Sequence, residues 1–114
     1  MKSFFLKRIK EIVGIGCVRH SDFIGKKIKK VAVCGGSGSF LIKDAISSGA
    51  DIFLTGDIKY HQFFEADKKI IIADIGHFES EQFTKELLLS ILIEKFPKFA
   101  VQISKCNTNA VNYL

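Results

Sequence analysis

The sequence is poor in the residues that cross-link or rigidify small domains. It has no tryptophan, one proline and three cysteines among 114 residues. Cys17, Cys34 and Cys106 are odd in number, widely spaced and form no CxxC pair, which argues against a disulfide framework and against a zinc knuckle. Cys34 ends an apolar run, where we expect it to behave as a small hydrophobic side chain.

Long apolar runs are also missing. The longest, residues 70–73 and 87–93, are too short or too interrupted to span a bilayer. Lys7 and Arg8 interrupt the first apolar residues of the chain, so that no signal-peptide core is present. We therefore expect a cytoplasmic protein without a membrane span.

The remaining composition is that of an ordinary globular domain. Hydrophobic residues make up 47% and charged residues 25% of the chain, which suits one hydrophobic core and argues against disorder. We predict a single domain over residues 1–114. Residues 1–30 hold nine Lys or Arg and two acids (+7), and residues 31–114 hold eight and ten (−2). The basic stretch 26–30 runs straight into a predicted strand, so we interpret it as solvated surface and do not expect nucleic-acid binding.

Hydrophobic periodicity predicts an alternation of helices and short strands. The predicted helices cover residues 3–13, 39–48, 59–66 and 79–96, the last with Phe83, Leu87, Leu88, Ile91 and Leu92 on its inner face. The predicted strands are a short edge strand at 17–19 and apolar runs at 30–34, 52–54, 70–75 and 99–104. This order predicts an α/β fold, a single lobe with a mostly parallel sheet flanked by helices.

Three polar turns each follow a predicted strand, at residues 35–39, 55–61 and 76–81. In an open α/β sheet the carboxyl ends of parallel strands share one edge, and ligands bind there. Segments that are far apart in the sequence are therefore expected to converge on one rim of the sheet.

His77 and Glu81 are the strongest candidates for metal ligands. They stand four residues apart at a helix start, so their side chains share one face of the helix. Imidazole and carboxylate together suit zinc, iron, manganese or a similar divalent ion, and Asp74 is placed to orient His77. Alternatively, His77 caps the turn and Glu81 complements the helix N-terminus. Two ligands are in any case too few for a complete site, because catalytic zinc sites usually have three plus water.

The turn Thr55–His61 supplies two further candidates. Asp57 either lines the site or caps the helix that follows it. His61 stands about one turn into that helix, where it could ligate a metal, transfer protons or simply pack. Because neutral imidazole suits general acid/base chemistry near pH 7, His61 is the leading candidate for that role, with Asp57 beside it as a tentative catalytic residue.

The glycine-rich run 35–39 follows a strand and opens a helix, as phosphate-binding loops do. Gly36, Ser37 and Gly38 are therefore tentative phosphate contacts. The run matches neither the Walker pattern nor the full Rossmann fingerprint. The alternative is a turn in which the missing side chains let the backbone approach a neighbouring element closely.

Three runs in this order and spacing resemble a known family. They are VAVCGGSGSF (residues 31–40), TGDIKYH (55–61) and DIGHFESE (74–81), followed by Asn107–Asn109 and Asn112-Tyr113. Together they are similar to the C-terminal half of the NIF-three-like, YbgI-type dinuclear metal-binding family, whose members are called GTP cyclohydrolase 1 type 2 homologues. The resemblance covers nearly the whole chain.

The resemblance implies a role for each candidate residue. His77 and Glu81 match the C-terminal metal ligands of the family, and Asp57 and His61 are expected to line the cleft. Family members hold two divalent ions between two similar α/β lobes and assemble as ring-like hexamers. The cyclohydrolase name implies hydrolytic opening of a guanine nucleotide ring by metal-activated water.

The chain also departs from the family pattern. Family members carry a His-His pair and an Asp in an N-terminal half, and this sequence has no His-His pair. We expect a fragment whose N-terminal lobe is missing, with a separate partner chain or a degenerate site as the alternatives. Three functions follow: a hydrolase half-site completed by that lobe in cis or trans, a non-catalytic metal-binding or assembly module, and a nucleotide-binding domain that uses the glycine run without metal.

Overall fold

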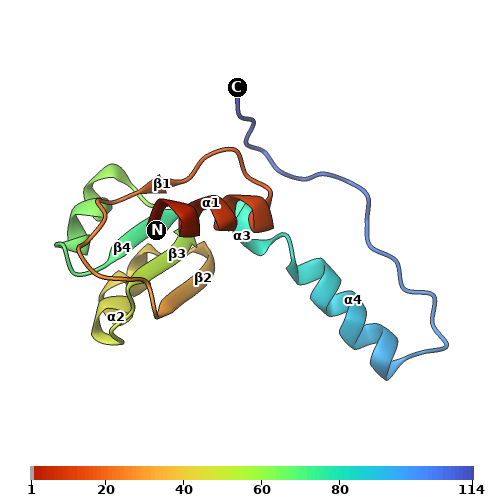
Figure 1. The fold of residues 1–114 in the computed structure, drawn as a ribbon. Helices are drawn as coiled ribbons and strands as arrows, with labels where there is room; N and C mark the ends of the chain where they lie inside the picture. The colour runs from red at the N-terminus through yellow and green to blue at the C-terminus, as the bar shows by residue number, and fades with distance from the viewer. Residues whose placement is uncertain (1) are drawn as a thin grey trace. The chain divides into compact units, whose positions relative to one another are not determined.

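The computed structural model describes residues 2–114, which form two compact units (Figure 1). The first unit ends at Glu81 and the second comprises Gln82–Leu114. All strands lie in the first unit, which also contains every buried residue of the described chain. Each unit is described by itself below.

A four-stranded sheet forms the centre of the first unit. Its strands are β1 (Arg19–His20), β2 (Val31–Ser37), β3 (Ile52–Gly56) and β4 (Ile71–Asp74), in the spatial order β1-β4-β3-β2. β2, β3 and β4 are parallel, and β1 pairs antiparallel with β4. The mostly parallel sheet predicted from the sequence is confirmed, although the edge strand overlaps its predicted span only at Arg19.

Helices precede the sheet and connect its parallel strands. They are α1 (Lys2–Val13), η1 (Ser39–Leu41), α2 (Ile42–Ser47) and η2 (Tyr60–Ala66). Gly49, at φ +75°, follows α2 in the left-handed conformation, which is common for a glycine just past a helix end. Residues 60–66, predicted as an ordinary helix, form the tighter 3-10 helix η2, which Asp67 ends with φ +45°.

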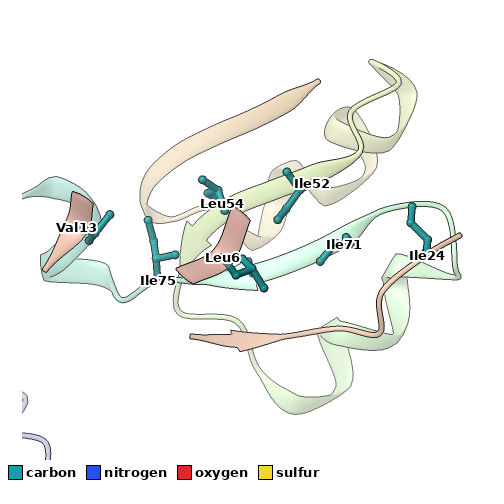
Figure 2. Close-up of a cluster of buried hydrophobic side chains, with 8 residues drawn as sticks. Leu6, Val13, Ile24, Ile52, Leu54, Ile71 and Ile75 are labelled. Atoms are coloured by element: carbon teal, nitrogen blue, oxygen red, sulfur yellow. The ribbon is translucent and has the colours of Figure 1, made fainter. Parts of the chain in front are cut away.

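Both faces of the central strands are covered. On one face, Leu6 and Val13 of α1 pack with Ile52, Leu54 and Ile71 (Figure 2). The opposite face carries a second cluster, in which Phe53 and Ile72 pack with residues of α2 and η2. Successive strand residues point to opposite faces of a sheet, which explains why β3 and β4 read as continuous apolar runs. Cys34 is half-buried against the second cluster, in keeping with its expected apolar role.

Asp51 anchors the start of β3. Its Oδ2 accepts hydrogen bonds from the backbone N–H groups of Lys29 and Lys30, both at 2.8 Å, and its Oδ1 lies 3.1 Å from Nζ of Lys26. These contacts, led by the two backbone N–H groups, lower the pKa of Asp51 from 3.8 to about 2. The carboxylate therefore fastens the basic stretch 26–30 to the sheet, so part of this stretch has a structural role.

Asp51 is expected to make the fold sensitive to acid between pH 4 and pH 2. Because its pKa is lower in the folded chain than in the unfolded chain, its stabilising effect is complete above about pH 4 and is lost as the pH falls through about 2. Asp51→Asn should lower the free energy of unfolding at pH 7 and flatten its decline between pH 4 and pH 2. Urea unfolding at four pH values measures both effects. An unchanged slope between pH 4 and pH 2 would contradict the assignment.

The second unit differs from the prediction at two points. The helix predicted over 79–96 is divided into α3 (His77–Glu81), which belongs to the first unit, and α4 (Thr84–Lys95). Residues 99–104, predicted as a strand, pair with no strand among the described residues. The side chains predicted on an inner face are exposed or half-exposed: Phe83, Leu87, Leu88, Ile91 and Leu92. The periodicity showed correctly which side chains are apolar. A strand or a buried helix face also needs a partner surface, and residues 82–114 contain no buried residue.

None of the helices found in residues 2–114 combines the length and the apolar character needed to cross a membrane.

Candidate metal centre

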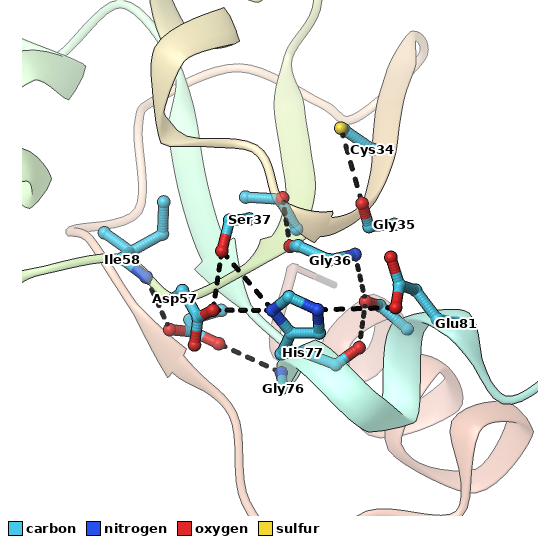
Figure 3. A network of polar contacts seen from close by, with 12 residues as sticks. Cys34, Gly35, Gly36, Ser37, Asp57, Ile58, Gly76, His77 and Glu81 are labelled. Atoms are coloured by element: carbon cyan, nitrogen blue, oxygen red, sulfur yellow. Dashed lines mark hydrogen bonds and ion pairs between the residues drawn. The ribbon is translucent and has the colours of Figure 1, made fainter.

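The three polar turns converge as predicted (Figure 3). Ser37 comes from the end of β2, Asp57 follows β3, and His77 begins α3. The Oδ2 of Asp57 lies 2.6 Å from both Oγ of Ser37 and Nδ1 of His77, so the three residues meet at one oxygen atom. The carboxyl edge of the parallel sheet therefore gathers side chains from positions 37, 57 and 77 into one site.

Asp57 orients His77. Its φ of +55° turns the chain sharply after β3, and its carboxylate accepts hydrogen bonds from His77 and Ser37. The N-cap position of η2 is held by Lys59, whose N–H donates to Oε1 of Gln62 at 2.8 Å. The capping role considered for Asp57 is therefore not the one that the structure shows.

The electrostatics of this pair are consistent with a fixed ring. The hydrogen bond from Ser37, and after it the one from His77, lowers the pKa of Asp57 below its ordinary value. The hydrogen bond to Asp57 raises the pKa of His77. Because Nδ1 donates its proton to Asp57, neutral His77 presents the lone pair of Nε2 on the other side of the ring. Metal-binding histidines are commonly oriented by a carboxylate in this way.

Glu81 faces that free nitrogen. Its Oε2 lies 3.3 Å from Nε2 of His77, as the spacing of four residues along a helix predicts. Both side chains are about half exposed, so the pair is open to a ligand from solvent. The two side chains face each other across one turn of α3 (Figure 3).

Gly36 makes room for the pair. It has φ +73°, and a Cβ at this position would clash with the carboxylate of Glu81 and lie 3.3 Å from Nε2 of His77. The backbone of β2 therefore passes directly beside both candidate ligands, which only glycine allows here.

The glycine run mainly serves this close approach. The N–H of Gly36 donates to Oγ of Ser80 at 2.8 Å, and its carbonyl accepts from Oγ1 of Thr55 at 3.2 Å. Gly38 packs against Thr55 with no space for a side chain. The close-approach alternative thus describes Gly36 and Gly38, and phosphate contact by Gly36, Ser37 and Gly38 stays a prediction.

Asp74 does not make the contact with His77 that the sequence suggested. Asp74 was predicted to orient His77 directly, but Asp57 makes that contact. Asp74 instead accepts hydrogen bonds from the backbone of Ile58 and Gly76 and pairs with Arg19. Its position three residues before His77 places it at the end of β4, where its carboxylate reaches the turns on either side rather than the imidazole ring.

His61 lies among aromatic side chains. On η2 its ring is 5.2 Å from Tyr60 and 6.5 Å from Phe64, measured between centroids. His20, the remaining histidine, stacks on Phe23 at 4.7 Å. The acid/base role of His61 stays a prediction, because its structural neighbours are rings and not the residues that surround His77.

Some residues of the site escaped the sequence reasoning. Ser80, which lies in the polar turn 76–81 but was not singled out, accepts the N–H of Gly36. Arg19 pairs with Asp74 and lies outside all three polar turns. Arg19 was predicted only as the end of the short edge strand 17–19. Only the three-dimensional meeting of distant segments identifies such residues.

The donor set fits half of a divalent-metal site. Nε2 of His77 and Oε2 of Glu81 face each other, and a carboxylate fixes the ring. Within residues 2–114, no group of three or more His, Cys, Asp or Glu side chains is arranged to hold a metal ion. The first unit therefore offers two candidate ligands, fewer than a complete site requires.

Known proteins are similar to this chain over most of its length. Residues 2–110 match the family described as Duf34/NIF3 (NGG1p interacting factor 3). A GTP cyclohydrolase 1 type 2 homolog from Campylobacter jejuni is 39% identical over 98 residues, which are 85% of this chain and 39% of the relative. A protein of the same name from Staphylococcus aureus is 36% identical over 115 residues, 96% of this chain and 31% of the relative. The chain thus spans well under half the length of these relatives.

Solved structures give the same result for the fold. The Staphylococcus aureus protein SA1388 superposes with a TM-score of 0.78 at 32% identity, over 95% of this chain and 36% of that protein. A Bacillus cereus protein related to NIF3 superposes with a TM-score of 0.77 at 27% identity, over 96% of this chain and 32% of its own.

Proposed function

The chain belongs to the Duf34/NIF3 family, and on that premise we propose that His77 and Glu81 are two ligands of a divalent metal ion. The observation that carries the proposal is the geometry of the pair. Nε2 of His77 and Oε2 of Glu81 lie 3.3 Å apart, and Asp57 holds the opposite ring nitrogen at 2.6 Å. Imidazole and carboxylate donors suit zinc, iron or manganese.

The half-site is proposed to be completed by a second lobe. Two protein ligands leave a metal ion weakly held, because a stable catalytic site needs at least three. The relatives are more than twice as long as this chain, which leaves room in them for a further lobe. We therefore assign the remaining ligands of two metal ions to an N-terminal lobe, in cis or in trans.

The proposed reaction class is metal-dependent hydrolysis of a nucleotide-like small molecule. It follows the name GTP cyclohydrolase 1 type 2 homolog, which the relatives carry. A bound divalent ion would supply an activated water and polarise the bond under attack. The residues of this chain would hold and orient the ligands: Asp57 keeps the Nδ1 proton of His77, and Gly36 leaves space beside Glu81. His61 remains the candidate acid/base residue.

Metal titration tests the half-site. Calorimetry measures Zn²⁺ binding to the chain by itself and to the chain with an N-terminal lobe supplied. The affinity should fall at least about tenfold in His77→Ala and in Glu81→Ala, because even a residue that only orients a metal ligand contributes that much. His20→Ala is the matched control, since His20 stacks on Phe23 instead of meeting Glu81. Equal affinity of wild type and both ligand variants, with the lobe present, would exclude the proposal.

The second unit favours one other candidate function, an assembly module. No residue among 82–114 is buried, and α4 exposes Leu87, Leu88, Ile91, Leu92 and Ile93. Exposed apolar surface of this kind marks interaction sites, and it supports a homo-oligomer, a hexamer by analogy with the family. Under this candidate the two-lobe protein binds metal or a partner but hydrolyses no GTP.

A further inference from the structure

One carboxylate at the end of β4 connects three separate parts of the first unit. Asp74 is only 8% exposed. Its Oδ1 accepts the N–H of Gly76 at 2.9 Å, and its Oδ2 accepts the N–H of Ile58 at 2.9 Å and Nη2 of Arg19 at 2.5 Å. Both oxygen atoms are therefore occupied by donors from the chain itself.

Two of these donors, Ile58 and Gly76, flank the candidate metal centre (Figure 3). Ile58 directly follows Asp57, and Gly76 directly precedes His77. Asp57 and His77 form the hydrogen bond that fixes the imidazole ring. Asp74 holds the backbone next to each of them. Its two oxygen atoms link the turn after β3 to the turn before α3.

Arg19 completes the connection from β1. Its Nη2 also donates to the carbonyl of Ile58 at 2.8 Å, so both backbone groups of Ile58 are held, one by Asp74 and one by Arg19. The Ile58 side chain is buried in the core cluster, which fixes it from a third direction. Asp57, one residue away, has very little freedom to move.

The backbone at this point requires such restraint. Asp57 has φ +55°, a conformation that costs free energy for a residue other than glycine and persists where the surroundings impose it. The turns are also in direct contact, since a Cβ on Gly56 would lie 2.7 Å from the backbone nitrogen of His77. A small shift of either turn would therefore change the 2.6 Å contact between Asp57 and His77.

We infer that Arg19 and Asp74 are positioning residues for the metal centre: the pair holds Asp57 against Nδ1 of His77 and thereby aims Nε2 at the metal position beside Glu81. The inference rests on the proposed function of His77 and Glu81, but it concerns the ring orientation, which exists without metal. Asp74 acts only through the backbone of Ile58 and Gly76.

The test compares two buried aspartates. Asp74→Asn keeps the size of the side chain but turns one acceptor into a donor, which opposes either the N–H of Gly76 or the donors at Oδ2. Asp51→Asn is the matched control, because Asp51 is 7% exposed, accepts two backbone N–H groups, pairs with a cation and lies at the other end of β3. Both variants lose a buried acceptor, and only Asp74 adjoins the centre.

The readout is the tautomer of His77 in the metal-free chain at a pH where the ring is neutral. ¹⁵N–¹H correlation spectra of the three histidines show it, with His77→Ala for assignment. The ratio of Nδ1–H to Nε2–H should fall about tenfold in Asp74→Asn, as for loss of a charge-assisted hydrogen bond, and stay unchanged in Asp51→Asn. An unchanged ratio in Asp74→Asn, or an equal fall in both variants, would overturn the inference.

Arg19 gives a second series in case Asp74→Asn fails to fold. Its side chain is 59% exposed, so Arg19→Gln should fold while lowering the same ratio about threefold, and Arg19→Lys, which keeps the charge but not the second contact, should restore it only in part. A wild-type ratio in Arg19→Gln would also overturn the inference. Zn²⁺ titration of the same samples separates the two proposals. If the wild-type chain binds no Zn²⁺ with the lobe present, His77 and Glu81 are not metal ligands. The tautomer ratio still decides whether Arg19 and Asp74 position the ring.

Discussion

Gly36→Ala is expected to weaken metal binding at least about tenfold while the chain stays folded. A Cβ at position 36 would meet the carboxylate of Glu81 and lie 3.3 Å from Nε2 of His77. The end of a glutamate side chain is flexible, so Glu81 can swing away without disturbing the sheet. The clash is then relieved by displacing a ligand, and the effect falls on binding more than on stability.

Gly49→Ala is the matched control for backbone strain. Gly36 and Gly49 have nearly the same φ, +73° and +75°, but nothing lies within 4 Å of a Cβ at position 49. Each substitution should therefore cost about 1–2 kcal/mol of folding free energy from the left-handed conformation alone. Urea unfolding measures this shared cost.

The difference between the two variants isolates the contact with the metal centre. Calorimetric titration with Zn²⁺, with the N-terminal lobe supplied, should show weak binding for Gly36→Ala and wild-type binding for Gly49→Ala. Wild-type affinity in Gly36→Ala would show that Glu81 does not need the space that this glycine leaves. Equal weakening in both variants would assign the effect to general loss of stability.

The sequence was sufficient to predict the parallel strands of the sheet and the meeting of the polar turns at one edge. Continuous apolar runs identified β3 and β4, because strands buried on both faces have no polar side. The run at β2 was also apolar, although this edge strand is largely exposed. The polar turns at their carboxyl ends then had to share one edge, and the contact of Asp57 with His77 confirms that they do. The four-residue spacing of His77 and Glu81 likewise predicted that they face each other.

The hydrogen-bond partners within the site could not be predicted, because they depend on backbone geometry. The sequence left Asp57 open between lining the site and capping the next helix, and it suggested Asp74 as the partner of His77. In the structure Asp57, at φ +55°, contacts the ring, and Asp74 holds the backbone of Ile58 and Gly76. Nothing in a one-dimensional pattern reports a positive φ at a residue other than glycine, so the assignment required the fold.

The second unit shows a different limit. The apolar spacing from Phe83 to Leu92 correctly predicted a helix, which the structure shows as α4. It did not indicate which surface, if any, covers that helix. The same holds for residues 99–104, whose pattern suits a strand but which have no strand partner among the residues described. An apolar face is buried only when a second surface packs against it, and the periodicity of one segment does not identify that second surface.

Stability measurements should separate the two units. Phe53→Ala is expected to lower the free energy of unfolding by about 3–5 kcal/mol, the usual cost of removing a large buried ring and leaving a cavity. Phe53 is 2% exposed and packs in the second core cluster of β3 and β4. Because small proteins have only about 5–15 kcal/mol in total, this variant loses a large part of its stability.

Leu88→Ala is the control, because it also removes a large apolar side chain. Leu88 is 53% exposed on α4, and alanine favours helix at least as well as leucine, so the change in the chain alone should stay within about 0.5 kcal/mol. Urea unfolding of both variants, with Phe53→Leu as the milder substitution in case Phe53→Ala does not fold, measures the contrast. A loss from Leu88→Ala as large as that from Phe53→Ala would mean that α4 is already covered in the isolated chain. A loss that arises only when the N-terminal lobe is added would instead identify α4 as the surface on which that lobe packs, and would join the assembly of the protein to the completion of its metal centre.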